Sequence, residues 1–269
     1  MIIPSPPYSF SIKTQGNPEK PSLLFLHGFM GSGEDFQEAI AQLTSDYYCL
    51  TLDLPGHGQT QTPPHVENYR FPSVAQGIIT LLTQLQRLPC CLAGYSLGGR
   101  LALYLALTFP HHFPKVILES SSAGLKTPRE RAERRQQDAQ LIERLTDLNF
   151  AQFLDRWYQN PLFASLRHHP QFPVMFQRRL QNQPQQLAQV LQGMGTGVQP
   201  PLWDLLPHYN RPLLLLVGEK DTKFQGINQE MARLCPGAQL KQVENCGHNI
   251  HLENVNSYVE LIRLFLNAP

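Results

Sequence analysis

The chain has 269 residues, of which 42% are hydrophobic and 16% are charged, and its formal net charge is +1. This length suits one large α/β domain or one domain with an inserted subdomain, and it can bury a sizeable core. A net charge this close to zero indicates no nucleic-acid partner and no attraction to a membrane surface. The start, MIIPSPPYSF, lacks the basic segment and long apolar run of a signal peptide, and no later run reaches membrane-spanning length. We therefore expect no membrane insertion.

The cysteines indicate the compartment. The chain has five, an odd number, and none shows the CxxC spacing of metal-binding or redox sites. We interpret all of them as reduced, small hydrophobic residues of a cytoplasmic protein: Cys49, Cys90, Cys91, Cys235 and Cys246. The sequence contains no metal-ligand cluster, so we expect no metal site.

Apolar runs separated by turn residues predict alternating strands and helices in the first 124 residues. Alternation over residues 8–14 predicts an edge strand. Buried strands are expected at residues 23–26, 47–52, 90–93 and 116–118. Helices are expected at residues 32–43, at residues 73–88 with Ser73 as the cap, and at residues 97–108.

The pattern changes after residue 124. Residues 126–192 contain no strand-like run and indicate helices rich in Gln and Arg. Strands return at residues 213–217 and 240–243, with helices near residues 227–234 and 254–266. Strands alternating with helices predict an α/β fold with a mostly parallel, doubly wound sheet. We expect a core of residues 1–124 and 200–269, with residues 125–199 inserted as a helical lid.

A GxSxG pentapeptide, residues 94–98, lies at the turn between an expected strand and the helix that follows it. Gly94 and Gly98 lack the Cβ atoms that would clash where the chain reverses, so Ser96 can be held exposed in a strained conformation. Strand, tight turn and helix in this order are typical of a nucleophile elbow. We therefore predict that Ser96 lies at the centre of an active site.

A serine hydroxyl is a poor nucleophile or base at neutral pH, so it needs a histidine to take its proton and a carboxylate to orient that histidine. In this architecture the acid follows the serine in the chain, in a loop after a later strand. Asp221 lies immediately beyond the strand expected at residues 213–217 and is the preferred acid. Glu219 is its competitor, and Asp204 is a weaker choice because it precedes that strand.

The histidine is expected last in the chain. His248 follows the strand expected at residues 240–243, and Gly247 before it favours a tight turn. His251 lies three residues later and is the competitor. The order of these residues along the chain predicts the triad Ser96, Asp221 and His248.

Two backbone N–H groups are candidates for stabilising negative charge on a reacting oxygen. The loop His27-Gly28-Phe29 follows an inner strand, the position from which such a loop supplies one donor, here the N–H of Phe29. The residue after the serine supplies the other donor, the N–H of Leu97.

Charge near the serine indicates the kind of ligand. Arg100 lies four residues after Ser96 on the same helix face, and its side chain leans back toward the serine. A buried guanidinium there either meets an internal carboxylate or awaits an anionic ligand. Residues 126–182 carry nine arginines and Lys126 against six acids, a net charge of +4. A cationic lid over this pocket favours a small substrate with several carboxylates.

Five stretches carry a resemblance to a known family: GYSLGGR at 94–100, ERAERRQQD at 130–138, WYQNPLFASL at 157–166, GEKDTKF at 218–224 and GHN at 247–249. The whole chain resembles the α/β-hydrolase superfamily, and within it the pyruvate-eliminating synthases of menaquinone and phylloquinone biosynthesis. The resemblance implies an α/β-hydrolase fold with an inserted helical lid. It also implies that no metal and no organic cofactor is needed.

The resemblance assigns roles to single residues. Ser96, Asp221 and His248 correspond to the family's triad. Arg100 corresponds to its pocket arginine, and Arg134 to a lid arginine that binds a substrate carboxylate. Further residues are implied in the pocket or at its mouth, with Arg179 as the alternative to Arg178: Tyr95, Trp157, Arg178 and Lys223.

The leading hypothesis is therefore a carbon-oxygen lyase that eliminates pyruvate and in which Ser96 acts as the base. A second hypothesis is a serine hydrolase acting on an ester, thioester or carbon-carbon bond of an acidic metabolite, because the same triad serves both reactions. A third is a ligand receptor that keeps the fold without turnover. The intact order of serine, aspartate and histidine argues against the receptor.

Overall fold

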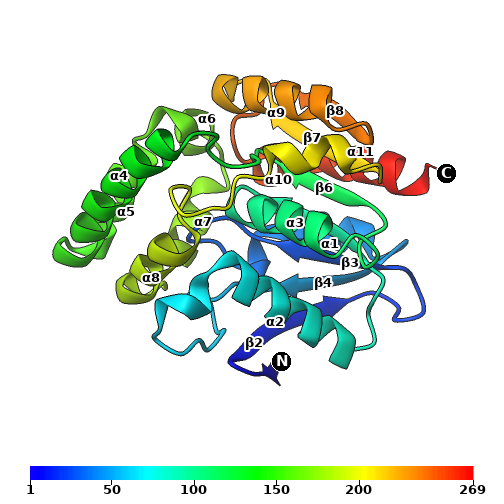
Figure 1. Cartoon of the computed structure of the whole chain (residues 1–269), viewed down its shortest axis with the longest axis horizontal. Helices are drawn as coiled ribbons and strands as arrows, with labels where there is room; N and C mark the ends of the chain where they lie inside the picture. Colours follow the sequence, from blue (N-terminus) through cyan, green and yellow to red (C-terminus); the bar gives the residue numbers. More distant parts are fainter. Residues whose placement is uncertain (269) are drawn as a thin grey trace.

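The structure is a computed structural model that describes residues 1–268, and its centre is an eight-stranded sheet in the order β1-β2-β4-β3-β5-β6-β7-β8 (Figure 1). The strands are β1 (Ile2–Ser5), β2 (Tyr8–Gln15), β3 (Ser22–Leu26), β4 (Tyr48–Leu52), β5 (Cys91–Tyr95), β6 (Val116–Glu119), β7 (Leu213–Gly218) and β8 (Ala238–Val243). The six strands β4, β3, β5, β6, β7 and β8 run parallel to one another, in this order across the sheet. The pairs β1-β2 and β2-β4 are antiparallel. The predicted α/β class with a mostly parallel sheet is confirmed.

Helices cover both faces of the sheet (Figure 1). They are α1 (Gln37–Leu43), α2 (Phe71–Gln84), α3 (Leu97–Thr108), α9 (Thr222–Leu234), α10 (Ile250–Glu253) and α11 (Val255–Asn267). Leu24 and Leu26 of β3 share one apolar cluster with residues of α2, α3 and α9. Leu23 and Phe25 belong to a second cluster with residues of α1 and α11. Alternate side chains of one strand thus point to opposite faces of the sheet, and each set packs against a different layer of helices.

Two local predictions are wrong. Residues 8–14 form a strand, but β2 lies second from the edge, because the short strand β1 pairs with it and takes the edge position. Helix α2 begins at Phe71 with Arg70 as its N-cap, so Ser73 lies inside the first turn. Pro72 explains the earlier start, because its fixed φ suits the first turn of a helix and its missing N–H costs nothing there.

Five helices lie between β6 and β7, and we call them the helical cap: α4 (Pro128–Asp147), α5 (Phe150–Tyr158), α6 (Ala164–Arg167), α7 (Phe172–Arg179) and α8 (Pro184–Met194). Figure 1 shows them together at one end of the sheet. No strand interrupts residues 126–192, as predicted. The cap has its own apolar cluster, which includes Leu145, Phe153 and Leu187 and extends to Met30 and Leu252 of the sheet domain.

Short 3-10 turns complete the described structure: η1 (Gly33–Phe36), η2 (Val66–Tyr69), η3 (Pro161–Phe163) and η4 (Trp203–His208). All five cysteines are free thiols, and burial raises the pKa of each of them. Within residues 1–268, no helix combines the length and apolar composition needed to cross a membrane.

The centre of β7 offers a test of the core. Leu215 is fully buried, opposite Leu118 of β6 and Leu240 of β8. Leu215→Ala should lower the free energy of unfolding by about 2–5 kcal/mol, because it removes apolar contacts and leaves a cavity. Urea denaturation followed by circular dichroism measures the effect. Leu264→Ala is the matched control, since that side chain is 65% exposed and should change stability by less than about 0.5 kcal/mol.

Candidate active site

Ser96 occupies the turn between β5 and α3 in a strained conformation. Its φ of 49° and ψ of −106° lie in a region that non-glycine residues rarely adopt. A hydrogen bond to the neighbouring strand β6 holds this turn, because the N–H of Ser96 donates to the carbonyl oxygen of Glu119 at 2.9 Å. A Cβ atom on Gly98 would lie 2.1 Å from the carbonyl oxygen of Leu26, so only glycine permits this approach of α3 to β3. The local packing thus exposes the serine hydroxyl at the carboxyl end of the sheet.

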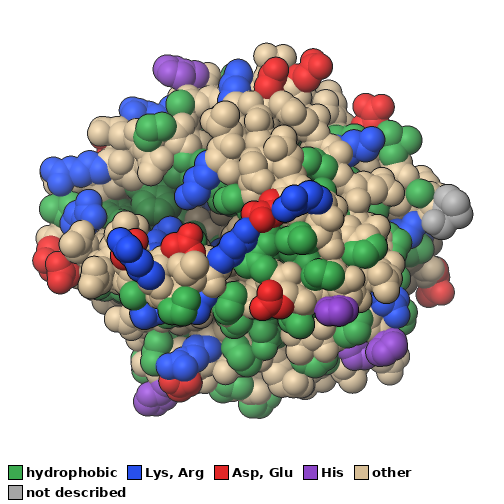
Figure 2. Space-filling model, turned by 45° about the horizontal axis from the view of Figure 1, so that its top comes forward, with side chains coloured by type: hydrophobic (Ala, Val, Ile, Leu, Met, Phe, Trp, Pro, Cys, Tyr) green, Lys and Arg blue, Asp and Glu red, His purple; other side chains and the backbone are tan. Residues whose placement is uncertain are grey.

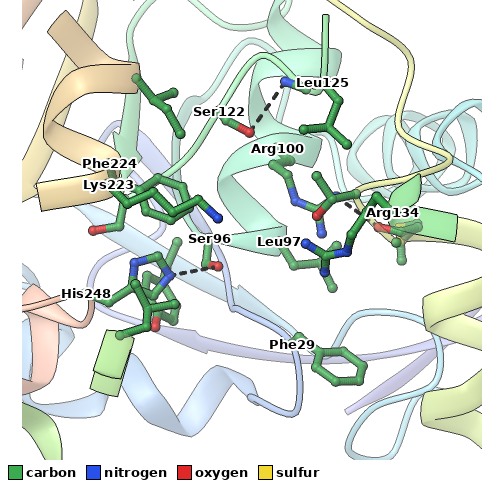
Figure 3. A pocket seen from close by; sticks show the side chains of 18 of the residues that line it. Phe29, Ser96, Leu97, Arg100, Ser122, Leu125, Arg134, Lys223, Phe224 and His248 are labelled. Carbon is green, nitrogen blue, oxygen red and sulfur yellow. Dashed lines mark hydrogen bonds between the residues drawn. The ribbon is translucent and has the colours of Figure 1, made fainter. Parts of the chain in front are cut away.

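The structure brings Ser96, His248 and Asp221 into one hydrogen-bonded chain. Figure 3 shows the part of it between His248 and Ser96. His248 Nε2 lies 3.1 Å from Ser96 Oγ, and His248 Nδ1 lies 2.7 Å from Asp221 Oδ2. Asp221 is 3% exposed and His248 is 2% exposed. A buried carboxylate at Nδ1 fixes the tautomer in which Nε2 can accept the serine proton. The geometry has the distances that general-base activation of a serine requires.

The competing residues lie elsewhere. Glu219 accepts a hydrogen bond from the N–H of Asn245, and Asp204 lies in η4 before β7. His251 contacts a different carboxylate, with Nδ1 2.8 Å from Glu119 Oε2. Both side chains of this second pair are fully buried. The order of residues along the chain therefore identified the histidine and the acid that meet Ser96.

The two predicted backbone donors both lie at the cavity that holds Ser96. Phe29 follows β3 and Leu97 is the first residue of α3, and both line this cavity. Among residues 1–268, the N–H groups of Phe29 and Leu97 donate to no protein acceptor. Two free donors beside an activated serine can hold a developing oxyanion.

Two buried histidines fix the loop that carries Phe29. The N–H of Leu54 donates to His27 Nε2 at 2.9 Å, and the N–H of Met30 donates to His57 Nε2 at 3.0 Å. Burial lowers the pKa of both histidines, so both imidazoles are neutral near pH 7 and their Nε2 atoms can accept. These two bonds hold residues 27–30 against residues 54–57, and with them the N–H of Phe29.

The cavity has a volume of about 450 Å³ and lies between the sheet domain and the helical cap. Figure 2 shows a hollow whose floor is apolar and whose rim carries Lys and Arg side chains. All the predicted pocket residues except Arg178 line it: Tyr95, Arg100, Arg134, Trp157 and Lys223. A pocket of this kind binds a small molecule with an apolar body and anionic groups.

Arg100 lies in this cavity without a carboxylate partner. Its Nη1 donates to the carbonyl oxygen of Met194 at 3.0 Å and to Gln199 Oε1 at 3.2 Å. Among the described residues it makes no ion pair. Burial and the neighbouring Arg134 lower the pKa of Arg100 to about 9, so the guanidinium remains charged at neutral pH. Of the two readings of the sequence, the structure favours a guanidinium that awaits an anionic ligand.

Arg134 projects from α4 toward the same space as Arg100 (Figure 3). Its Nε lies 2.7 Å from Asp138 Oδ1 one helical turn away, and its side chain is 32% exposed. The carboxylate orients this guanidinium while other donors remain free. Arg100 and Arg134 together create a cationic wall in the cavity.

The prediction for Arg178 needs correction. Arg179, not Arg178, lines the cavity. The buried Arg179 side chain binds both oxygens of Asp35, with Nη1 at 3.0 Å and Nη2 at 2.7 Å, and its Nε donates to the hydroxyl of Tyr158. Arg178 contacts Asp35 Oδ1 from the other side at 3.2 Å. Successive residues of a helix point about 100° apart, so only one of the two can face the cavity.

Aromatic rings complete the wall. The ring centroids of Tyr95 and His248 are 5.4 Å apart, and those of Trp157 and Phe29 are 5.7 Å apart. These rings pack against the histidine of the triad and the loop with the Phe29 donor. Lys223 lies beside Phe224 at the start of α9, and its Nζ points into the space above Ser96 (Figure 3).

Comparisons with known proteins agree with this geometry. The alpha/beta hydrolase fold family matches residues 21–255, so the chain belongs to the α/β hydrolases. The 2-succinyl-6-hydroxy-2,4-cyclohexadiene-1-carboxylate synthase of Salmonella typhimurium strain LT2 is 35% identical over 255 residues, which cover 93% of this chain and 96% of that protein. The solved structure of MenH from S. aureus has a TM-score of 0.89 at 34% identity, covering 96% of this chain and 97% of that one. Within the α/β hydrolases, the chain belongs to the 2-succinyl-6-hydroxy-2,4-cyclohexadiene-1-carboxylate synthase family.

A plant relative extends the match. Protein PHYLLO, chloroplastic, of Arabidopsis thaliana is 30% identical over 265 residues, which cover 93% of this chain and 16% of that longer protein. The family resemblance carried by GYSLGGR and the other motifs is therefore confirmed.

The sequence analysis missed several residues of the site, for which the sequence gives only weak local signals. Asp35, Lys126 and Gln199 were not singled out for it. Lys126 lines the cavity and forms an ion pair with Glu230 of α9. Partners such as Asp35 and Arg179 lie 144 residues apart, and no local spacing links them. An acid in the first turn after β3 and a run of two arginines were the available clues.

The buried pair of Asp35 and Arg179 predicts a pH dependence of stability. Burial alone would raise the pKa of Asp35, but Arg179 and Arg178 hold it at about 2, below the ordinary value of 3.8. Because the folded pKa is lowered, the stabilisation is fully present above about pH 4 and is lost as the pH falls toward 2. Asp35→Asn should remove this part of the acid dependence and lower the free energy of unfolding at pH 7 by about 3–5 kcal/mol.

Chemical denaturation between pH 2.5 and 7 measures both effects. Glu34→Gln is the matched control, since the neighbouring carboxylate forms an exposed pair with Lys13 and should contribute less than about 1 kcal/mol. An Asp35→Asn protein with the stability and acid profile of the unmodified chain would contradict the assignment.

Proposed function

We propose that this protein is a carbon-oxygen lyase of menaquinone or phylloquinone biosynthesis. It converts 2-succinyl-5-enolpyruvyl-6-hydroxy-3-cyclohexene-1-carboxylate to 2-succinyl-6-hydroxy-2,4-cyclohexadiene-1-carboxylate and pyruvate. The observation that carries the proposal is a hydrogen-bonded triad, Ser96, His248 and Asp221, that opens into a cavity lined by Arg100 and other cations. The names of the relatives that match along the whole chain support the same reaction.

The triad supplies the base. His248, oriented by Asp221, accepts the proton of Ser96 through Nε2, and the serine oxygen removes the ring proton on the carbon beside the succinyl ketone. The released electron pair forms a new ring double bond, the existing double bond shifts by one position, and the carbon-oxygen bond to the enolpyruvyl group breaks. The leaving group departs as the enolate of pyruvate and takes a proton. Atoms and electrons balance without a further reactant.

The backbone donors stabilise the charge that develops. Deprotonation beside the ketone places negative charge on the ketone oxygen, and the N–H groups of Phe29 and Leu97 are free to bind it. Removing one such donor typically costs about 3–4 kcal/mol of transition-state stabilisation. The loop is fixed before substrate binds, so the donors need no reorganisation during the reaction.

The cations hold the substrate. The succinyl, ring and enolpyruvyl groups each bear a carboxylate, so the partner is a small polycarboxylate. Arg100, Arg134 and Lys223 lie around the cavity at positions from which they can bind these groups. Residues 125–199 act as the lid over this substrate, and the five free thiols suit a reducing compartment, the cytoplasm.

Replacing the base tests the reaction. Ser96→Ala should lower the rate of pyruvate release by at least about 1,000-fold, because the histidine then has no hydroxyl to activate. Pyruvate is followed with lactate dehydrogenase and NADH, and a chromogenic ester is supplied in parallel. Full elimination activity in the variant would rule out the proposed base. Rapid ester turnover by the unmodified protein with no pyruvate would indicate a serine hydrolase instead.

Arg100 provides a second test. Arg100→Ala should lower kcat/KM about 10-fold to 100-fold, because a charge-assisted bond to a substrate carboxylate is lost. Arg129→Ala is the matched control, since that arginine of α4 is 89% exposed and pairs only with Glu133 at the surface. Near-equal kcat/KM values for both variants would remove Arg100 from the binding site.

A further inference from the structure

Gln199 contacts Arg100 from behind the cavity. Its side chain is 1% exposed, and it belongs to the segment between α8 and η4, outside the wall that surrounds Ser96. Its Oε1 accepts from Arg100 Nη1 at 3.2 Å, and its Nε2 donates to the carbonyl oxygen of Ser122 at 3.1 Å. A carbonyl oxygen can only accept, so the amide nitrogen must face Ser122 and the amide oxygen must face the guanidinium.

The surrounding backbone holds this amide in place. The N–H of Gln199 donates to the carbonyl oxygen of Gly195 at 3.1 Å. Gly124 has a φ of +94°, and a Cβ atom there would lie 3.3 Å from Gln199 Cδ. The backbone at Gly195 on one side and at Gly124 on the other thus encloses the amide of Gln199. Gln199 and the carbonyl of Met194 together hold the guanidinium of Arg100 at the cavity wall.

The chemistry of these acceptors differs from that at the neighbouring arginines. Arg134 pairs with Asp138 and Arg179 pairs with Asp35, so each of these charges has a protein counter-ion. Arg100 donates only to an amide oxygen and a main-chain oxygen, which orient the guanidinium and do not neutralise it. The carboxylate nearby, Asp138, is already paired with Arg134. A protein carboxylate at position 199 would have filled the same space and neutralised that charge.

We propose that Gln199 is a positioning residue that fixes Arg100 through a neutral acceptor, so that a carboxylate of the ligand supplies the missing counter-ion. The inference rests on the proposed function for the identity of that ligand, a cyclic keto acid with several carboxylates. It adds a residue that selects for anionic ligands without touching them.

Two replacements of similar size separate charge from packing. Gln199→Glu keeps an oxygen acceptor for Arg100 but adds a negative charge, whereas Gln199→Met keeps the volume and loses the acceptor. Both variants lose the donor to the carbonyl oxygen of Ser122, so the difference between them reports the acceptor and the charge presented to Arg100. If only the acceptor mattered, Glu, which keeps it, would be the milder change. Our inference makes Glu the more harmful one for anion binding, because it supplies the counter-ion internally.

The probe is 2-succinylbenzoate, a stable aromatic keto acid with one carboxylate on the ring and a second at the end of the succinyl chain, titrated into each protein in a calorimeter. We expect Kd to rise about 10-fold or more for Gln199→Glu and about threefold for Gln199→Met, since one charge-assisted bond is worth roughly one decade. In pyruvate release, KM should rise in the same order with a smaller change in kcat. Equal or tighter binding by Gln199→Glu than by Gln199→Met would overturn the inference.

A double-mutant cycle covers the case in which Gln199→Glu fails to fold. If Gln199 acts through Arg100, Gln199→Met should change Kd by less than about 1.5-fold in an Arg100→Met background. A full threefold effect in that background would also overturn the inference. The comparison of Kd values and the double-mutant cycle measure binding alone and do not depend on turnover. If the unmodified protein released no pyruvate but the predicted order of Kd held, the proposed reaction would fail and the role of Gln199 would stand.

Discussion

The close contact between α3 and the end of β3 is the constraint on which the site depends. Gly98 brings the helix so near to Leu26 that Ser96 must adopt its strained conformation between β5 and α3. The strain persists because β5 is held between β3 and β6 in the middle of the sheet. The same contact places the N–H of Leu97 beside the serine oxygen. One glycine contact therefore sets the position of the hydroxyl and of one oxyanion donor.

The cations around Ser96 fall into two groups, those paired with a protein carboxylate and those without one. Asp35 and Asp138 hold two arginines, and Glu230 holds Lys126, so much of the cationic roof is balanced within the protein. Arg100 is a partly buried cation that donates only to neutral oxygens within the described chain. Desolvating an unbalanced guanidinium costs free energy that a ligand carboxylate can return on binding. The site therefore favours anions through cations that have no carboxylate partner in the described chain, Arg100 and Lys223.

The sequence predicted the parts of the molecule that local rules determine. Ser96, Asp221 and His248 each lie just beyond a buried strand, and such positions converge at one edge of a parallel sheet. The short strand β1 was not predicted, because its four residues include a proline and show little alternation of apolar and polar side chains. The pocket arginine was assigned to Arg178 instead of Arg179, because two adjacent arginines cannot be distinguished until the orientation of the helix is known. Gln199 has no local pattern, since its role arises from contacts to Arg100 and Ser122 that are distant in sequence.

The helical cap and the catalytic loops share buried contacts, which explains how the site is ordered before ligand binds. Met30 and Leu252 belong to the apolar cluster of the cap, and they lie next to the Phe29 donor and four residues beyond His248. Asn182 of the cap donates to the carbonyl oxygen of Met30, and the ion pair of Arg179 with Asp35 joins α7 to the turn after β3. Because these contacts are buried, the loops cannot move without disturbing the cap. The cap is thus part of the machinery that positions the base and the donors, as well as a source of positive charge.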